Sequence, residues 1–479
     1  MQNFDLFFRE RQWSVSALQM SAILAISDFL ILLSIWACSV WIKYFVTQGQ
    51  LSLLLYWRLA PCLGLFVVMN AFIGLYPGIL LSPPEEIKKI SQSTSLIFLA
   101  LAAGVFLSKQ GMLFSRSIFL TAWVGSIVIL PYCRSRIRKI AHRLNWWGVP
   151  AIILGAGKTG KLVVEALGRE YRLGLKPIAF FDDDLSKLGQ RVANIPVLGP
   201  LGAACGLADK YRNTVAILAM PGLSPSKLVA ILEGAASDFR RVILVPDLFG
   251  MSSLWVSAFD LGGIVGLDLQ QKLLDPRRQI VKRIMELCLI AFFLPFLMPL
   301  CVLIALSVKL SSKGPVFFRQ KRIGFGGKDI EIWKFRTMVS DAAAVLQNYL
   351  AHNPELRIEW EANHKLTCDP RITPIGRLLR KTSLDELPQL WNVVRGDLSL
   401  VGPRPIVWDE VDKYKNGFSL YKKVRPGLTG LWQISGRSDT SYEERIRLDS
   451  FYVRNWSVWL DIYILTKTPE EVLRCRGAC

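Results

Sequence analysis

The sequence predicts an α-helical membrane bundle, then a Rossmann-like α/β domain, then a mainly α-helical domain that enters the membrane through a re-entrant helix hairpin. Hydrophobic residues make up 52% of the 479 positions, which is more than one soluble core needs. Short apolar strands alternate with helices in the middle of the chain, and basic Gly/Pro-rich motifs gather in the last third. We place the three domains at residues 1–145, 146–270 and 276–479.

Four apolar segments open the chain; the first exceeds the ~20 residues that a membrane span needs, and the other three are close to or slightly below that length. They cover residues 15–45, 59–75, 94–107 and 114–132. No cleavable leader pattern comes before them, so we expect the first to remain as a span. The basic residues Arg9, Arg11, Lys88 and Lys89 and the cluster at 134–143 should fall on one side, the cytoplasmic side. Asp28 lies inside the first span, where a carboxylate needs a partner, and we favour a helix–helix contact over a functional role.

The α/β pattern lies between residues 148 and 268. Strands are expected at residues 150–154, 176–181, 215–219 and 241–245, and a helix is expected at 160–170. Gly155, Gly157 and Gly160 form a GxGxxG motif between strand and helix, and an acidic run at 182–184 follows the second strand. This spacing is typical of a Rossmann-like domain that binds a dinucleotide. The alternative is that the glycines only permit a tight turn, so nucleotide binding stays open.

A fifth apolar segment, residues 284–310, is long enough to cross the membrane, but its sequence favours a return. Pro295 and Pro299 lie near its centre, where each removes a helix hydrogen-bond donor. Both flanks are basic, so a simple crossing would leave one cluster outside the cell. We therefore predict a helix–break–helix hairpin over 282–310 that enters from the cytoplasm and returns there, with its break at the two prolines.

The charge and the motifs of the last third indicate anionic ligands. A formal net charge of +20 needs anionic partners, and the long apolar runs favour membrane lipids and phosphorylated substrates over nucleic acid. Nine cysteines without a CxxC pair argue against a zinc site, and three histidines without a GxSxG motif argue against a serine hydrolase. Arginines in rigid Pro/Gly loops suit bidentate contacts with phosphate. The motifs are WKFRTM at 333–338, DPR at 369–371, TSLDELPQ at 382–389, VGPRP at 401–405, RPGLTG at 425–430 and SGR at 435–437.

On these motifs the sequence resembles the bacterial polyprenyl-phosphate sugar-phosphate transferases, also called monotopic phosphoglycosyl transferases. The match covers residues 282–468, and the whole chain looks like the large form of the family, nearest to the undecaprenyl-phosphate galactose phosphotransferases. The resemblance implies transfer of a sugar-1-phosphate, with galactose the favoured sugar, from a UDP-sugar to undecaprenyl phosphate with release of UMP. It further implies a multi-pass protein of the bacterial inner membrane, catalytic on its cytoplasmic face, that serves O-antigen, capsule or exopolysaccharide synthesis. The oligomeric state, a homodimer included, stays open.

The same resemblance assigns roles to individual residues. Asp385 is the expected nucleophile, which takes up the phosphosugar before the lipid phosphate does, and Asp385 and Glu386 are the candidate ligands of Mg²⁺. Glu386 is alternatively a group that orients or deprotonates the acceptor. Arg380 matches the position assigned to polyprenyl phosphate. The candidates for the nucleotide diphosphate are Arg404, Arg425, Arg437, Lys334 and Arg336.

Two features are less settled by the resemblance. Asp449 and Asp461 fall where the family has acidic residues, and a structural ion pair and metal assistance are equal alternatives for them. The family commonly has Ser-Pro at the hairpin break, whereas this chain has Met298 before Pro299. A hydroxyl that could bind the freed backbone is therefore missing there.

Two other functions compete with this interpretation. A membrane-anchored, NAD-dependent nucleotide-sugar dehydratase or epimerase would need a Tyr-x-x-x-Lys pair in the α/β domain, but only Tyr463 and Lys467 have that spacing, in the last domain. A non-catalytic scaffold or polysaccharide-export component would leave the pair Asp385-Glu386 without a purpose. The sequence context therefore favours the transferase.

Overall fold

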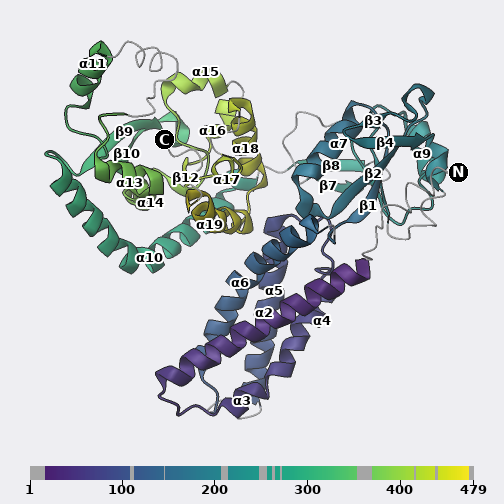
Figure 1. Ribbon diagram of the computed structural model, residues 1–479, viewed down its shortest axis with the longest axis horizontal. Helices are drawn as coiled ribbons and strands as arrows, with labels where there is room; N and C mark the ends of the chain where they lie inside the picture. The colour runs from purple at the N-terminus through teal and green to yellow at the C-terminus, as the bar shows by residue number, and fades with distance from the viewer. Residues whose placement is uncertain are drawn as a thin grey trace. The chain divides into compact units, whose positions relative to one another are not determined.

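The computed structural model describes residues 17–107, 113–144, 146–205, 214–246, 256–260, 265–269, 272–352, 369–414, 417–436 and 441–473. Arg437 lies outside these residues, so its predicted role is not addressed by the structure. The chain divides into two compact units, Met1–Phe249 and Gly250–Cys479, and each is described by itself (Figure 1).

The first unit begins with a bundle of apolar helices. Its elements are α2 (Ala17–Val46), α3 (Leu53–Trp57), η1 (Ala60–Leu63), α4 (Gly64–Phe72), α5 (Pro83–Leu107) and α6 (Arg116–Arg143). Four stretches of the unit are long and apolar enough to cross a membrane: Leu18–Val46, Leu53–Phe72, Pro83–Leu107 and Arg116–Arg143. The predicted helical N-terminal region is therefore confirmed. The second stretch is built of three short helices, with Pro61 at the start of the middle one.

Two of these helices extend well beyond the apolar runs that predicted them. We expected the third and fourth spans at 94–107 and 114–132, whereas α5 begins at Pro83 and α6 continues to Arg143. The added turns carry charged side chains, among them Glu86, Arg134 and Arg138, which are buried. Hydropathy alone assigns such charged residues to positions outside a span, because it does not show the partners with which they are buried.

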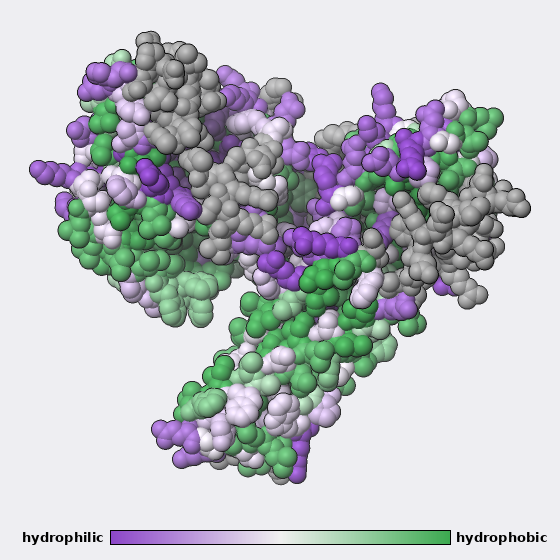
Figure 2. All heavy atoms as spheres, in the orientation of Figure 1, coloured by the Kyte–Doolittle hydropathy of each residue, from purple (hydrophilic) through white to green (hydrophobic). Residues whose placement is uncertain are grey.

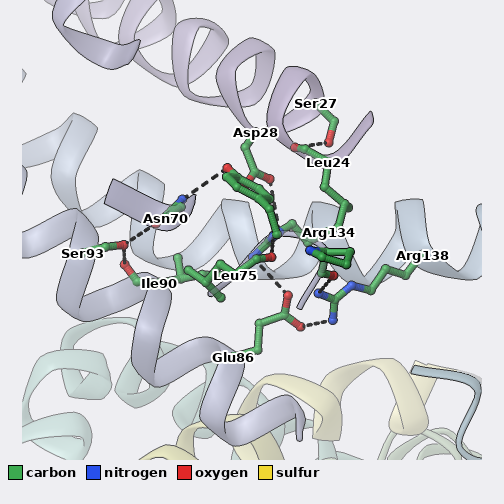
Figure 3. Close-up of polar contacts among 12 residues, drawn as sticks. Leu24, Ser27, Asp28, Asn70, Leu75, Glu86, Ile90, Ser93, Arg134 and Arg138 are labelled. Atoms are coloured by element: carbon green, nitrogen blue, oxygen red, sulfur yellow. Dashed lines mark hydrogen bonds and ion pairs between the residues drawn. The ribbon is translucent and has the colours of Figure 1, made fainter. Parts of the chain in front are cut away.

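The buried charges form one network at one end of the bundle (Figure 3). Arg134 and Asp28, both 0% exposed, lie 3.3 Å apart between Nε and Oδ1. Glu86 forms ion pairs through both carboxylate oxygens, one with Arg134 Nη1 at 3.2 Å and the other with Arg138 Nη1 at 2.8 Å. The Tyr76 hydroxyl donates to Asp28 Oδ2 at 2.6 Å. Two guanidinium groups thus balance two carboxylates, and Asp28 makes the helix–helix contact that its position predicted.

A six-stranded sheet completes the first unit, in the order β3-β4-β2-β1-β5-β6. β1 lies between β2 and β5 and is parallel to both, while only β3 runs antiparallel to its neighbour. The elements are β1 (Val149–Leu154), α7 (Lys158–Arg169), η2 (Tyr171–Leu173), β2 (Leu175–Phe181), η3 (Leu185–Lys187), β3 (Arg191–Val192), β4 (Ile195–Gly199), η4 (Leu201–Ala204), β5 (Val215–Leu218), α9 (Pro225–Glu233) and β6 (Val242–Leu244). This arrangement confirms the Rossmann-like prediction, with strand ends within about two residues of those expected.

One hydrophobic core joins the sheet to the bundle. Met20 and Leu24 of α2 pack in the same buried cluster as Ile153 of β1 and Val164 of α7. The sheet and this end of the bundle therefore share one packed interior.

The second unit is mostly helical around small sheets. Its elements are β7 (Val256–Asp260), β8 (Val265–Leu269), η5 (Lys272–Leu274), α10 (Pro276–Ser311), β9 (Phe317–Ile323), η6 (Phe325–Gly327), β10 (Asp329–Phe335), α11 (Ala342–His352), α13 (Pro374–Thr382), η7 (Leu384–Glu386), α14 (Gln389–Arg395), β11 (Ser399–Val401), η8 (Trp408–Glu410), α15 (Val411–Tyr414), α16 (Phe418–Tyr421), β12 (Gly427–Thr429), α17 (Leu431–Ile434), α18 (Tyr442–Asn455) and α19 (Val458–Leu473). β9 and β10 form an antiparallel hairpin, and β11 pairs with β12 in parallel.

The expected break at Pro295 and Pro299 is not present, because α10 is one helix of 36 residues with both prolines inside it. Each proline removes a single donor, which bends a helix when the bonds on either side hold, and Figure 1 shows α10 bent. The predicted division of 282–310 into two helices was therefore wrong.

Both ends of α10 pack on the second unit, whereas its middle is exposed and apolar. Ile290 joins one buried cluster, and Ile304 and Val308 join another. Between them, Phe296 is 72% exposed and Met298 is 63% exposed. Figure 2 shows the apolar side chains gathered over this helix. Of the described helices of this unit, α10 alone is long and apolar enough to be a candidate span.

Candidate active site

The acidic pair Asp385-Glu386 lies in η7, a single turn between α13 and α14. α13 starts at a strong cap, where the Thr373 hydroxyl accepts from the Gly376 amide at 2.9 Å. It ends at Thr382, and the next residue, Ser383, caps it with a φ of +54°, which is left-handed and uncommon for a residue with a side chain. This turn redirects the chain, and Leu384 and Leu387 then pack into the core beside it. The acidic pair is thus fixed by a strained turn and two apolar anchors.

The two carboxylates lie between two cations. The Lys334 ammonium donates to Glu386 Oε1 at 2.7 Å. Burial raises the pKa of Asp385 to about 6, the Glu386 carboxylate adds to that rise, and Lys334 and Arg380 oppose it. A carboxylate with this pKa is largely ionised at neutral pH while it keeps more proton affinity than an ordinary aspartate.

Arg380 reaches the site from the last turn of α13. Its Nε donates to the Thr337 hydroxyl at 2.9 Å. Burial lowers the pKa of Arg380, while the nearby carboxylates Asp385 and Asp369 raise it. Asp369 is itself held by Arg371, which donates Nη2 at 2.6 Å and Nε at 2.8 Å to its two oxygens. The DPR motif therefore forms an ion pair whose carboxylate acts electrostatically on Arg380.

The other predicted phosphate-binding arginines have different neighbours. Arg336 is 8% exposed and donates Nη2 to Ser312 O at 2.8 Å, so it holds the loop after α10. Arg404 lies over the Trp432 ring at 5.5 Å from its centroid, and Arg425 donates Nε to Gly396 O at 2.9 Å. The structure therefore brings together Asp385, Glu386, Lys334 and Arg380 and gives the remaining three described candidates other contacts.

Asp449 and Asp461 are buried acids in hydrogen-bonded networks. Burial raises the pKa of Asp449 to about 7, and the Tyr414 hydroxyl donates to it at 2.7 Å. Asp461, 0% exposed, accepts Lys282 Nζ at 2.6 Å and Tyr452 Oη at 2.6 Å. Sequence reasoning missed Lys282 as the partner, although a lysine at the entry of an apolar helix was a signal for one.

The glycine motif of the first unit has a steric explanation. Gly155 has a φ of +106°, and a Cβ at Gly160 would collide with the Gly155 carbonyl oxygen. The acid after β2, Asp182, accepts from the Ala156 amide at 2.7 Å and from Lys187 Nζ at 3.0 Å. A Cβ at Gly157 would meet open space. Two of the three glycines are thus explained by packing, and dinucleotide binding stays a prediction.

The acidic pair offers two carboxylates to a metal. Among the residues that the structure describes, no group of three or more His, Cys, Asp or Glu side chains is placed to hold a metal ion. Two carboxylates suit Mg²⁺, which commonly takes one or two of them and completes its shell with water and substrate phosphates. The donor set therefore fits a magnesium ion that arrives with a diphosphate.

Comparisons with known proteins cover both units. Residues 277–475 match the family described as bacterial sugar transferase, and residues 71–246 match a CoA-binding domain. The chain is 36% identical to the UDP-galactose-lipid carrier transferase of Erwinia amylovora over 82% of each chain. It is 37% identical to the undecaprenyl-phosphate galactose phosphotransferase of Salmonella typhimurium over 76% of each. The UDP-glucose:undecaprenyl-phosphate glucose-1-phosphate transferase of Escherichia coli is 33% identical over 72% of this chain and 73% of its own.

Proposed function

The chain belongs to the bacterial sugar transferase family and is a sugar phosphotransferase, and from this premise we propose that it transfers galactose-1-phosphate from UDP-galactose to undecaprenyl phosphate. The observation that carries the proposal is the half-buried Asp385 carboxylate, with a pKa of about 6, between the cations Lys334 and Arg380. Relatives that are named for galactose support the choice of sugar.

The transfer proceeds in two displacements at one phosphorus atom. An Asp385 oxygen attacks the phosphorus that bears the sugar, the bond from that phosphorus to the UMP oxygen breaks, and UMP leaves with the electron pair. A phosphate oxygen of undecaprenyl phosphate then attacks the same phosphorus, and the Asp385 carboxylate leaves unchanged. The raised pKa suits the first step, because the group is ionised for attack near neutral pH and becomes a better nucleophile as its basicity rises.

The neighbouring residues of this chain position the reactants. Arg380 offers its Nη groups to phosphate oxygens, and Lys334 keeps the Glu386 carboxylate beside Asp385. Mg²⁺ held by Asp385 and Glu386 would neutralise charge on the diphosphate.

The apolar middle of α10 supports a membrane location for the acceptor step. Both ends of α10 pack on the same unit while Phe296 and Met298 are exposed, which favours a bent helix that dips into the bilayer and returns. Basic residues on both flanks of α10 favour the cytoplasmic face of the inner membrane for the catalytic unit. The polyprenyl chain would then approach Asp385 from the lipid.

The proposal is tested with purified protein in lipid nanodiscs that contain undecaprenyl phosphate and magnesium. We expect UMP release from UDP-galactose at a rate at least tenfold above that from UDP-glucose, and appearance of sugar label in the lipid fraction, without any added NAD. Nanodiscs without undecaprenyl phosphate are the control. UMP release from UDP-glucose alone would mean that the transferred sugar is glucose and not galactose. An absence of lipid-linked label with every UDP-sugar would refute the function.

The raised pKa of Asp385 gives a prediction for stability against pH. The folded-state pKa of about 6 exceeds the ordinary 3.8, so folding favours the protonated carboxyl and is penalised wherever the group is ionised. In buffer with EDTA, Asp385→Asn should therefore raise the unfolding temperature at pH 8 by a few degrees. This corresponds to a gain of about 1–2 kcal/mol in the free energy of unfolding. The gain should shrink between pH 6 and pH 4 and be absent below it. Asp409→Asn, at an exposed site, is the control; a gain that does not depend on pH would contradict the assignment.

A further inference from the structure

Helix α13 packs directly against the backbone of Thr337, and we call this contact the seat of the helix. The Thr373 amide, at the start of the helix, donates to the Thr337 carbonyl oxygen at 3.0 Å. A Cβ at Gly376 would overlap that same carbonyl group. Because the helix turns its one side-chain-free position toward Thr337, any larger residue at 376 would push α13 away.

The same seat fixes Arg380. Residues 376 and 380 are four apart on a helix and so share a face, which brings Arg380 over Thr337 as well. Its Nε donates to the Thr337 hydroxyl at 2.9 Å, and Thr337 is only 7% exposed. This bond holds the guanidinium group by its Nε. Both Nη groups can then donate to two oxygens of a phosphate.

The nearby carboxylate of Asp369 is kept from binding the two Nη groups of Arg380. Asp369 lies close enough to Arg380 to act on it electrostatically. Both of its carboxylate oxygens are engaged by Arg371, at 2.6 Å and 2.8 Å. The side chain of Asp369 is 7% exposed, so water does not replace this partner. Asp369 is thus occupied by Arg371, and Asp385 is the other carboxylate that acts electrostatically on Arg380.

We propose that Thr337 is a positioning residue that orients Arg380 toward the phosphate group at the reaction centre, and that Gly376 sets the distance at which α13 holds it. The inference rests on the proposed function, since the phosphate is that of a substrate. Both the UDP-sugar and the lipid acceptor carry such a group, so the two sources are separated by experiment.

The test compares Thr337→Val, which keeps the shape and loses the acceptor, with Thr337→Ser, which keeps the hydroxyl. In nanodiscs, kcat and KM are measured for UDP-galactose and for undecaprenyl phosphate separately. We expect Thr337→Val to lower kcat/KM tenfold or more for the substrate whose phosphate Arg380 holds, and Thr337→Ser to remain within threefold of wild type. Equal values for valine and wild type, or equal losses for valine and serine, would overturn the role.

A binding measurement separates this inference from the proposed function. Calorimetry with inorganic pyrophosphate needs no turnover, and we expect the dissociation constant of Thr337→Val to exceed those of wild type and Thr337→Ser at least fivefold. If wild type fails to turn over any UDP-sugar but this difference persists, the function is wrong and the positioning role holds. If pyrophosphate binds all three proteins alike, or none, the role is refuted whatever the turnover.

A glycine substitution tests the seat itself. Gly376→Ala should lower kcat/KM at least tenfold, because the added methyl group must displace α13 from Thr337. Gly168→Ala, on a helix where a Cβ meets open space, is the matched control and should leave turnover unchanged. Folded Gly376→Ala protein with wild-type kinetics would exclude the seat.

Discussion

Asp385→Asn should remove both turnover and the covalent intermediate. Incubated with magnesium and UDP-galactose but no lipid acceptor, wild-type protein is expected to gain the mass of one hexose phosphate, as read by intact-protein mass spectrometry. The asparagine variant should gain none, because its amide has no anionic oxygen with which to attack phosphorus. Its turnover should fall by about 10⁴-fold or more, the loss typical when a nucleophile is removed.

The controls of this experiment separate mechanism from folding. Asp409→Asn makes the same chemical change at an exposed site and should keep both the adduct and the turnover. A full adduct on the asparagine variant would place the nucleophile elsewhere. If wild type gains no mass yet releases UMP once undecaprenyl phosphate is added, the transfer is direct, and the two-step scheme fails while the overall reaction stands.

Arg134→Met should destabilise the first unit severely. The substitution leaves Asp28 without its cation in a fully buried site and halves the positive charge around Glu86. Breaking one side of a buried ion pair costs about 3–5 kcal/mol, a large share of the stability of a domain. We expect a fall in folded yield and in unfolding temperature, measured by size-exclusion chromatography and thermal unfolding in detergent.

A neighbouring arginine and a double variant complete the test. Arg136 lies on the same helix but is exposed, and it donates to the Tyr132 hydroxyl one turn away at 2.8 Å, so Arg136→Met should cost about 0.5 kcal/mol or less. Adding Asp28→Leu to Arg134→Met should recover part of the lost stability, because the double variant no longer buries the Asp28 carboxylate without its cation. Equal effects of the two single arginine variants would show that the buried network does not stabilise the bundle.

The sequence predicted those features that depend on local patterns. The strands around Ile153 were found because buried parallel strands are continuous apolar runs, and the long helices because lipid demands about 20 apolar residues. Asp385 and Glu386 were identified through the motif that contains them. The resemblance assigned Arg380 and Lys334 to the substrates, whereas the contact of Lys334 with Glu386 was not predicted.

Contacts between distant segments could not be predicted. The extension of α5 and α6 depends on Glu86 and Arg134 finding one another, and hydropathy counts each as a reason to end a span. The left-handed Ser383 carries no local signal, since serine ordinarily avoids that conformation. The seat of Gly376 on Thr337 joins two motifs that are separate in the sequence. α10 was predicted to break because prolines disrupt isolated helices, whereas packing at both ends keeps this one continuous.

The charge network also constrains how the protein is made. Translation proceeds from the N-terminus, so Asp28 leaves the ribosome before Glu86 and well before Arg134. Until α6 has been synthesised, the first span carries a carboxylate whose cation does not yet exist, and such a helix is poorly accommodated by lipid alone. We therefore expect α2 to be stably folded only once α6 has been synthesised.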